Sequence, residues 1–298
     1  MVGGVVPEPW GPGEAEAYMA EQEPVMSAAI LAGIGAVLDE IRAAVMSASG
    51  VPNLAAWNGT SLAWETFILN GPIADMVERI IGHVLAMDGY RSSTLTYARQ
   101  HIQTVWSRLR DWPQDAWAEV AAELDAGIAA GDDARQLRER VGDALNVTAL
   151  TRTTEAEMER LYDRIEQGVS PATESELRAR IRDLAGTADR ARRRWEWRAD
   201  RIARTEVAGA VNAGVEAFAA ESEAATGRGW HKQWWSSLDG RVRPTHRAAH
   251  GQVVPPGARF HVGGASLRYP GDPLGPAHEV IQCRCSTLLL TAAEAANA

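Results

Sequence analysis

Both cysteines of the chain lie near its C-terminal end, where a single residue separates Cys283 from Cys285. Two histidines that precede them, His246 and His250, are four residues apart, so on a helical turn they would share one face. Alternate residues of a strand also share a face, which would turn both thiols to the same side. Zinc accepts two imidazoles and two thiolates in a tetrahedral arrangement. The sequence therefore predicts a candidate zinc site made of these four side chains, and we expect no other cofactor.

The same residues have a simpler interpretation. Structural zinc sites usually have two or more residues between neighbouring cysteines, so Cys283 and Cys285 could instead be two buried thiols of a core strand, with histidines hydrogen-bonded nearby. A disulfide between them would close a strained small ring, which a reducing cytoplasm does not favour. His231, His261 and His278 are either substitute ligands or ordinary surface histidines.

A second polar group follows the Asp239-Gly240 turn, and it contains Asp239, Arg241, Arg243 and His246. In an enzyme, His246 would act as a general base and Asp239 would orient it. The alternative is a loop held together by salt bridges, and we favour this alternative. The chain has no glycine-rich phosphate loop, no Gly-x-Ser-x-Gly and no His-Glu-x-x-His motif. We therefore expect a protein that is not an enzyme.

Charge is distributed unevenly along the 298 residues, whose formal net charge is −9. Residues 1–151 contain 9 basic and 20 acidic side chains, which gives −11, whereas residues 226–298 contain 8 and 4, which gives +4. The acidic N-terminal half argues against broad wrapping of DNA, because contacts to phosphate need Lys and Arg. The basic C-terminal segment could still contact nucleic acid.

The apolar pattern predicts an α+β protein in which the N-terminal two-thirds are mostly long helices and a small C-terminal α/β module has short strands. We expect a flexible arm over residues 1–23, a helical domain over 24–147, a long-helix region over 148–225 that packs on the module, and the module itself over 226–298. Helices are expected from Asp132 to Leu145, from Thr151 to Gln167, from Pro171 to Gly186 and from Thr187 to Ala225. In the module, strands are expected at residues 230–236, 252–254, 259–262 and 280–290.

Two pairs of tryptophans have spacings that place them on different faces. Trp195 and Trp197 cannot share a helical face, so one of them is expected to contact another domain or a partner. Trp234 and Trp235 would face opposite sides of a strand, as in a sheet that is covered on one side by the long helix.

No membrane attachment is expected from the sequence. We find no apolar run that approaches the roughly 20 residues of a membrane span. The N-terminus lacks the basic and apolar regions of a secretory signal. We expect synthesis in the cytoplasm.

A set of residues between positions 202 and 290 gives the chain a family resemblance. The segment has Ile202-Ala-Arg-Thr-Glu, a later Asn212, then Gly251-Gln-Val, Phe260 and Pro270-Gly-Asp. Its principal matching residues are Arg204, Glu206, Trp234, Asp239, Arg241, His246, Asp272, Cys283, Arg284 and Cys285. In order and spacing, this segment resembles the phage head morphogenesis family, which comprises the Mu F-like minor head proteins of tailed bacteriophages. The preceding 200 residues match only in their general helical character. At position 250 the family often has an Asp- or Asn-like polar residue, whereas this chain has His250.

The resemblance implies a structural minor capsid protein that acts in head morphogenesis. Such proteins associate in several copies with the portal protein inside the head, and some contact packaged double-stranded DNA, here through the basic module. The major capsid or scaffolding protein is a further possible partner. The implied location is the virion, near the portal vertex, after assembly in the host cytoplasm. The alternative is a zinc-dependent hydrolase or nuclease, or a toxin-like enzyme that uses the C-terminal His, Asp and Cys residues.

Overall fold

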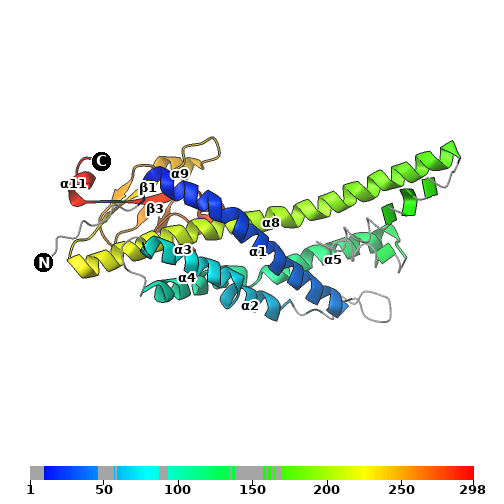
Figure 1. The fold of residues 1–298 in the computed structure, drawn as a ribbon, viewed down its shortest axis with the longest axis horizontal. Helices are drawn as coiled ribbons and strands as arrows, with labels where there is room; N and C mark the ends of the chain where they lie inside the picture. Colours follow the sequence, from blue (N-terminus) through cyan, green and yellow to red (C-terminus); the bar gives the residue numbers. More distant parts are fainter. Residues whose placement is uncertain are drawn as a thin grey trace. The chain divides into compact units, whose positions relative to one another are not determined.

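The structure is a computed structural model that describes residues 10–45, 57, 59–86, 93–133, 136–137, 157–158, 160–162, 164–165 and 170–298. The predicted α+β class is confirmed, because long helices precede a C-terminal region of short antiparallel strands (Figure 1). The principal helices are α1 (Pro12–Val45), α2 (Leu62–Leu69), α3 (Pro72–Ala86), α4 (Thr94–Leu109), α5 (Trp112–Ala130) and α8 (Pro171–Thr226).

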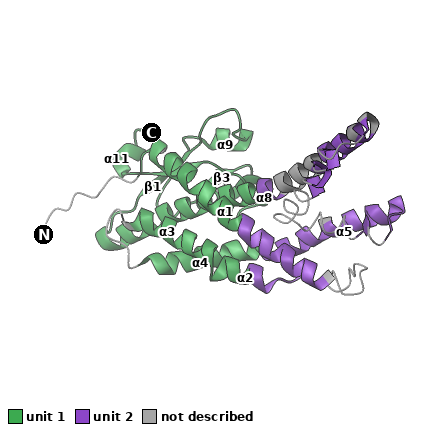
Figure 2. Cartoon of the chain, turned by 45° about the vertical axis from the view of Figure 1, so that its right-hand side comes forward, with its two compact units in different colours: residues 1–30, 65–109, 199–298 green, residues 31–64, 110–198 purple. Residues whose placement is uncertain are grey.

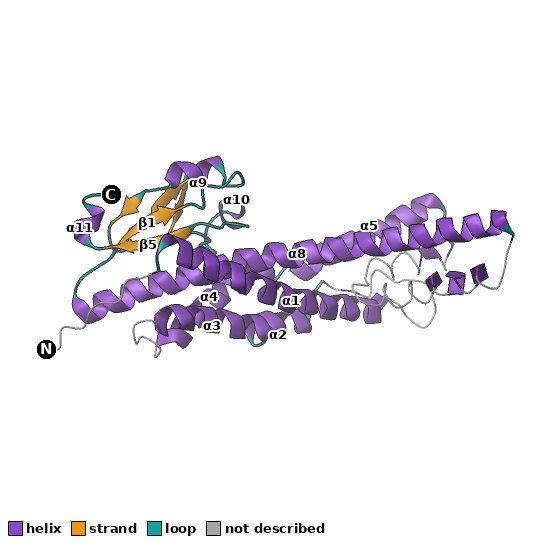
Figure 3. Cartoon of the chain, turned by 45° about the horizontal axis from the view of Figure 1, so that its top comes forward, coloured by secondary structure: helices purple, strands orange, loops and turns teal. Residues whose placement is uncertain are grey.

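The C-terminal module contains two small sheets (Figure 3). The first has the order β2-β1-β5, and β1 pairs antiparallel with both neighbours. The second is an antiparallel hairpin of β3 and β4. The strands are β1 (His231–Trp235), β2 (Val253–Val254), β3 (Phe260–Val262), β4 (Ala265–Leu267) and β5 (Ser286–Leu290). Short helices lie between and after them: α9 (Pro244–Ala249), α10 (Ala277–Val280) and α11 (Ala292–Ala295).

The chain forms two compact units that are discontinuous in sequence (Figure 2). Unit 1 comprises Met1–Ile30, Glu65–Leu109 and Ala199–Ala298, and unit 2 comprises Leu31–Trp64 and Arg110–Arg198. This division differs from the contiguous domains expected from the sequence. The reason is that α1 and α8 are each long enough to contribute one part to each unit. Changes of composition along the sequence do not reveal that one helix belongs to two units.

The N-terminal arm is shorter than predicted. Helix α1 begins at Pro12, so residues 12–23 are helical, and Pro24 lies inside the helix. Ala15 and Met19 are buried, with exposed fractions of 2% and 4%, and this burial stabilises helical structure in a segment rich in turn-forming residues. Residues 1–9 of the predicted arm lie outside the described residues.

Helix α1 also contains a longer apolar stretch than we expected from the sequence. Among the described residues, Gly13–Ala44 has the length and the mean hydropathy, 1.6, of a helix that can cross a membrane. Length and composition alone are weak evidence, because a core helix has the same properties. Ile30, Ile34 and Ile41 are fully buried within the protein, and 39% of the apolar window is buried in all.

Helix α8 is a single helix of 56 residues, so the predicted break at Gly186 is wrong. One glycine inside a helix costs only about 1 kcal/mol, which the helix-forming residues on both sides offset. In unit 2, Trp195 of α8 is buried against Trp112, which in turn packs on Trp64. In unit 1, Asn212 of α8 links the helix to the sheet.

Asn212 shows how the long helix positions the C-terminal module. Its side-chain amide donates to the carbonyl of Cys285 at 3.1 Å, and its carbonyl oxygen accepts from the amide of Thr287 at 2.8 Å. Asn212 is fully buried, so these bonds satisfy backbone groups that have no access to water. They fix the segment that contains the two cysteines at the start of β5.

Two predicted helices lie mostly outside the described residues. Of the helix expected from Asp132 to Leu145, the structure describes residues 132, 133, 136 and 137. Of the helix expected from Thr151 to Gln167, it describes residues 157–158, 160–162 and 164–165, all of which are helical.

Candidate functional site

Three of the four predicted zinc ligands form one buried group. Nδ1 of His246 lies 3.4 Å from Sγ of Cys285 and 3.7 Å from Sγ of Cys283. The three potential ligand atoms all lie within 4.8 Å of one another. His246 comes from α9, whereas the cysteines come from the segment between α10 and β5. No more than 2% of any of these residues is exposed.

The cysteines do not lie on the predicted strand from residue 280 to 290. Residues 277–280 form α10, and β5 begins only at Ser286. Cys283 and Cys285 nevertheless share a side: both sulfurs lie near Nδ1 of His246, whereas Arg284 turns outward to an ion pair with Asp239 at 2.6 Å. The predicted alternation of side chains therefore holds outside regular strand structure.

A buried carboxylate completes the surroundings of His246. Nε2 of His246 lies 3.0 Å from Oε2 of Glu279, which comes from α10 and is 3% exposed. The hydroxyl of Thr245 donates to the same oxygen at 2.9 Å. Gly263 allows this approach: its φ is +57°, and a Cβ at this position would lie 1.9 Å from Oε1 of Glu279. The glycine is thus needed for both its backbone conformation and its lack of a side chain.

The two thiols differ in acidity because they interact with each other. The hydrogen bond with Cys285 raises the pKa of Cys283 well above its usual range, and burial acts in the same direction. The hydrogen bond from Cys283 lowers the pKa of Cys285, against the effect of burial, and His246 and Ser236 lower it further. Of the two thiols, Cys285 is therefore the more acidic.

Ser236 lies beside this group at the end of β1. Its hydroxyl is 3.6 Å from Sγ of Cys285, and it donates to the carbonyl of His246 at 2.7 Å. Ser236 is 1% exposed. It therefore links β1, α9 and the cysteine segment at one buried point.

His250 is not part of the group, contrary to the predicted four-ligand set. Helix α9 ends at Ala249, so His250 does not continue the helical turn that would align it with His246. Its Nδ1 accepts a hydrogen bond from the amide of Ser236 at 3.1 Å, and its ring packs against Trp235. Among the described residues, His231, His261 and His278 also lie outside the group.

Asp239 does not orient His246 either, because Glu279 has that position. The Asp239 carboxylate instead pairs with Arg284, and it accepts from the backbone amide of Arg241 at 2.9 Å. These two hydrogen bonds lower the pKa of Asp239 to about 2. Asp239 therefore stabilises the loop through a salt bridge, as we expected in preference to a catalytic role. Arg243 donates to the carbonyl of Ile281 and so joins the loop to the cysteine segment.

The motif residues of α8 tie the helix to three other segments. Arg204 forms an ion pair with Glu23 of α1 at 3.1 Å, and Thr205 accepts from the amide of Gln282 at 2.9 Å. Glu206 pairs with Arg108 of α4 at 2.5 Å. Glu206 is 1% exposed, so its carboxylate joins α8 to α4 inside the protein, although it stands among charged residues in the sequence.

Asp272 has a comparable structural role within the module. Its carboxylate accepts a hydrogen bond from the backbone amide of Arg268 at 3.0 Å. It accepts two more from the guanidinium group of the same residue, at 3.0 and 2.6 Å. It also accepts from the amide of Leu274 at 3.1 Å. The buried carboxylate thus fixes the turn that follows β4.

Sequence reasoning missed three residues. Glu279 and Ser236 have no motif that marks them, although Glu279 stands four residues before Cys283 and its charge could have suggested a partner for a histidine. His101 of α4 is fully buried, and neither of its ring nitrogens has a hydrogen-bond partner among the described residues. Burial lowers the pKa of His101 to about 3, and Arg108 contributes in the same direction. The ring is therefore neutral in the folded protein at physiological pH.

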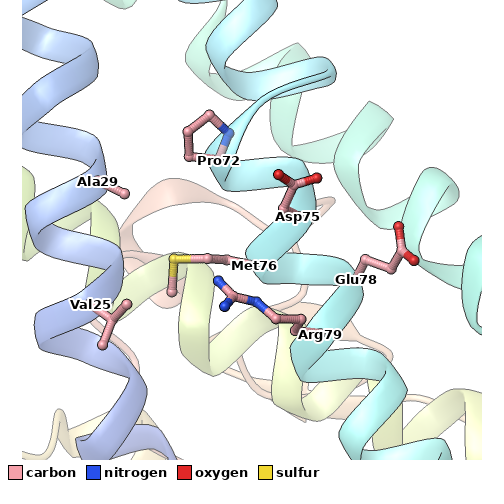
Figure 4. Close-up of a pocket in the computed structure, with 7 residues that line it drawn as sticks. All are labelled: Val25, Ala29, Pro72, Asp75, Met76, Glu78 and Arg79. Atoms are coloured by element: carbon pink, nitrogen blue, oxygen red, sulfur yellow. The ribbon is translucent and has the colours of Figure 1, made fainter.

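A separate surface feature is an open groove of about 500 Å³ between α1 and α3 in unit 1 (Figure 4). Met76 of α3 extends toward α1, where Val25 and Ala29 face it. The charged residues that complete the lining are Asp75, Glu78 and Arg79. Val25 is 52% exposed, so an apolar surface in this groove is accessible from solvent.

The family comparison agrees with the resemblance and extends it toward the N-terminus. The family described as phage Mu protein F like protein matches residues 118–288, which is more than half of the chain. The match begins in α5, well before the module on which the resemblance rested. No curated protein and no solved structure matches the chain. The chain therefore belongs to the phage Mu F-like family and is a bacteriophage head morphogenesis protein, a minor capsid protein of the phage head.

Proposed function

We propose that this protein docks on the portal protein inside the phage head and that the groove between α1 and α3 is the docking surface. The observation that carries this assignment is the exposed apolar lining of the groove next to Asp75 and Glu78. An amphipathic segment with a basic side chain would bury the apolar surface and neutralise the carboxylates. Apolar anchors surrounded by charged residues are the usual composition of such interfaces.

Point substitutions test this docking surface better than truncation. Removal of residues 1–150 would delete α1, α3 and α4, which contribute to the same unit as the C-terminal module. Loss of binding after such a deletion would then reflect loss of folding. A single charge placed in the groove leaves that unit intact.

Val25→Glu is expected to reduce recovery of the protein with its co-expressed portal protein by at least about tenfold, since it replaces an apolar anchor by a charge that must be desolvated at the interface. The matched control is Leu95→Glu on α4, because Leu95 is 49% exposed and does not line the groove. The measurement is affinity capture followed by size analysis. Equal capture of both variants at the wild-type level would contradict the assignment, and capture by the major capsid or scaffolding protein instead would replace the portal as the partner.

We also propose that the C-terminal module contacts packaged double-stranded DNA. Four of its basic side chains are engaged inside the protein: Lys232 with Glu216, Arg243 with Ile281, Arg268 with Asp272, and Arg284 with Asp239. The exposed arginines are Arg228, Arg241, Arg247 and Arg259. Of the four acidic residues of the module, Asp272 and Glu279 are buried, Asp239 pairs with Arg284 and Arg241, and Glu294 is exposed. The exposed positive charge that could face DNA is therefore centred on Arg228, Arg247 and Arg259.

A triple variant, Arg228→Gln with Arg247→Gln and Arg259→Gln, is expected to weaken binding to double-stranded DNA and to make it less dependent on salt. Each lost phosphate contact lowers the slope of log K against log salt by about 0.9. Arg180→Gln is the control, because Arg180 is an exposed arginine of unit 2 that lies outside the module. Binding measured by fluorescence anisotropy over a salt series gives the slope. An unchanged slope in the triple variant would contradict DNA contact through the module.

The proposed role is structural, with several copies near the portal vertex of the virion after assembly in the host cytoplasm. The burial of His246, Cys283 and Cys285 supports this choice over a zinc-dependent hydrolase, nuclease or toxin-like enzyme. A catalytic zinc site keeps a position open to substrate, whereas no more than 2% of any of these three residues is exposed.

A further inference from the structure

The spacing of His246, Cys283 and Cys285 matches the coordination geometry of zinc. With Zn–S distances of about 2.3 Å and Zn–N distances of about 2.0–2.1 Å, tetrahedral geometry places a sulfur and a nitrogen ligand about 3.6 Å apart. The structure has Nδ1 of His246 at 3.4 Å from Sγ of Cys285 and 3.7 Å from Sγ of Cys283.

The far side of the imidazole has the arrangement that metal sites use to orient a histidine. A histidine that binds a metal through one ring nitrogen almost always donates the other N–H to a carboxylate, a carbonyl or water. Here Nε2 of His246 lies 3.0 Å from Glu279, and the hydroxyl of Thr245 holds the same carboxylate oxygen. If the ring proton is on Nε2, where Glu279 accepts it, the lone pair of Nδ1 is directed at the two sulfurs, as metal binding requires.

We propose that His246, Cys283 and Cys285 bind one Zn²⁺ through Nδ1 and the two thiolates, and that Glu279 orients the histidine from behind. His250 is not a ligand. Oγ of Ser236 lies 3.6 Å from Sγ of Cys285, so this hydroxyl is the candidate for the fourth ligand.

The function of the metal is to hold the module together. The ligands come from α9 and from the segment before β5, and Ser236 follows β1, so one ion would join three segments that are far apart in sequence. The strands of the module have only two to five residues and provide few ladder hydrogen bonds. A structural zinc contributes folding free energy directly, which suits a small module of this kind.

Cobalt(II) and zinc(II) binding to the full chain, after metal has been removed with a chelator, tests this site. Cobalt is expected to bind at one ion per chain with the strong visible absorption of a tetrahedral site and with thiolate-to-cobalt charge-transfer bands. Zinc is expected to displace it. The single variant Cys285→Ser should lose the charge-transfer intensity of one thiolate. The double variant Cys283→Ser with Cys285→Ser should show no thiolate-to-cobalt band.

Two further variants separate a metal site from simple packing. Glu279→Gln keeps the size of the side chain and is expected to weaken zinc affinity by about 10–100-fold, because it removes the charge that orients His246. His250→Gln keeps an acceptor for the Ser236 amide, and both it and His278→Gln should bind zinc as the wild type does. Circular dichroism of each variant reports whether the fold is retained.

Absence of thiolate-to-cobalt bands in the wild-type chain would overturn the proposal, and this result does not depend on the folding of any variant. Equal loss of affinity in His250→Gln and Glu279→Gln would also overturn the three-ligand assignment. Portal docking is measured separately at the groove between α1 and α3, so failure of one proposal leaves the other standing.

Discussion

Arg108→Ala is expected to lower the free energy of unfolding by about 3–5 kcal/mol at neutral pH, which is the usual cost of removing one partner of a buried ion pair. The Arg108 side chain is 19% exposed and contacts the Glu206 carboxylate, whose side chain is 2% exposed. Its removal leaves a carboxylate in α8 with no counter-charge and almost no water. Urea unfolding followed by circular dichroism measures the change.

The pH dependence of this variant follows from Glu206. Burial already raises the pKa of Glu206 above its ordinary value of 4.5, and Arg108 acts in the opposite direction. Loss of Arg108 therefore raises the folded-state pKa further. The folded variant then retains a proton that the unfolded chain releases, so its stability falls as pH rises from 4.5 through the raised pKa. The difference from the wild type should be smallest below pH 4.5 and largest at neutral or higher pH.

Two controls identify the buried pair as the cause. Replacing both partners, as Arg108→Met with Glu206→Leu, should restore most of the stability, because apolar side chains of similar size leave no buried charge. Arg180→Ala should cost no more than about 1 kcal/mol, since Arg180 is 53% exposed in its pairs with Glu157 and Asp183. A loss in Arg108→Ala that does not change with pH would contradict the role of Glu206.

Trp234→Ala is expected to destabilise unit 1 by about 3–5 kcal/mol, the range for loss of a large aromatic side chain from a core. Trp234 is fully buried in β1, and its ring meets both His246 and Phe260 edge-on at centroid distances of 5.3 Å. The cavity would open directly beside His246. Thermal unfolding of the full chain, monitored by near-ultraviolet circular dichroism, measures the loss.

Trp235→Ala is the matched control, because it removes the same side chain from the next residue of the same strand. Trp235 lies on the opposite face, is only partly buried, and packs on His250. It should cost no more than about half as much as Trp234→Ala. Equal losses at both positions would show that the core is not confined to one face of β1, against the burial pattern of the strand.

The sequence by itself predicted those features that depend on neighbouring residues. Alternation along β1 correctly placed Trp234 and Trp235 on opposite faces, because the side-chain period of a strand is two, and the structure shows that Trp234 is the buried one. The same reasoning separated Trp195, which is 1% exposed, from Trp197, which is 55% exposed. It also brought Cys283 and Cys285 to one side, although the segment is not regular strand.

Only the tertiary structure decided which distant residues meet. Glu279 and not Asp239 faces His246, since Glu279 of α10 meets Thr245 and His246 of α9 across more than 30 residues of sequence. His250 is not one of the grouped ligands because α9 ends at Ala249. The periodicity of a sequence does not locate the end of a helix to within one residue. Nothing in the sequence around Glu206 marks it as buried, yet it is 1% exposed and pairs with Arg108 of α4. Pairings of this kind depend on contacts between segments, and a local pattern contains no information about the segment that will lie opposite.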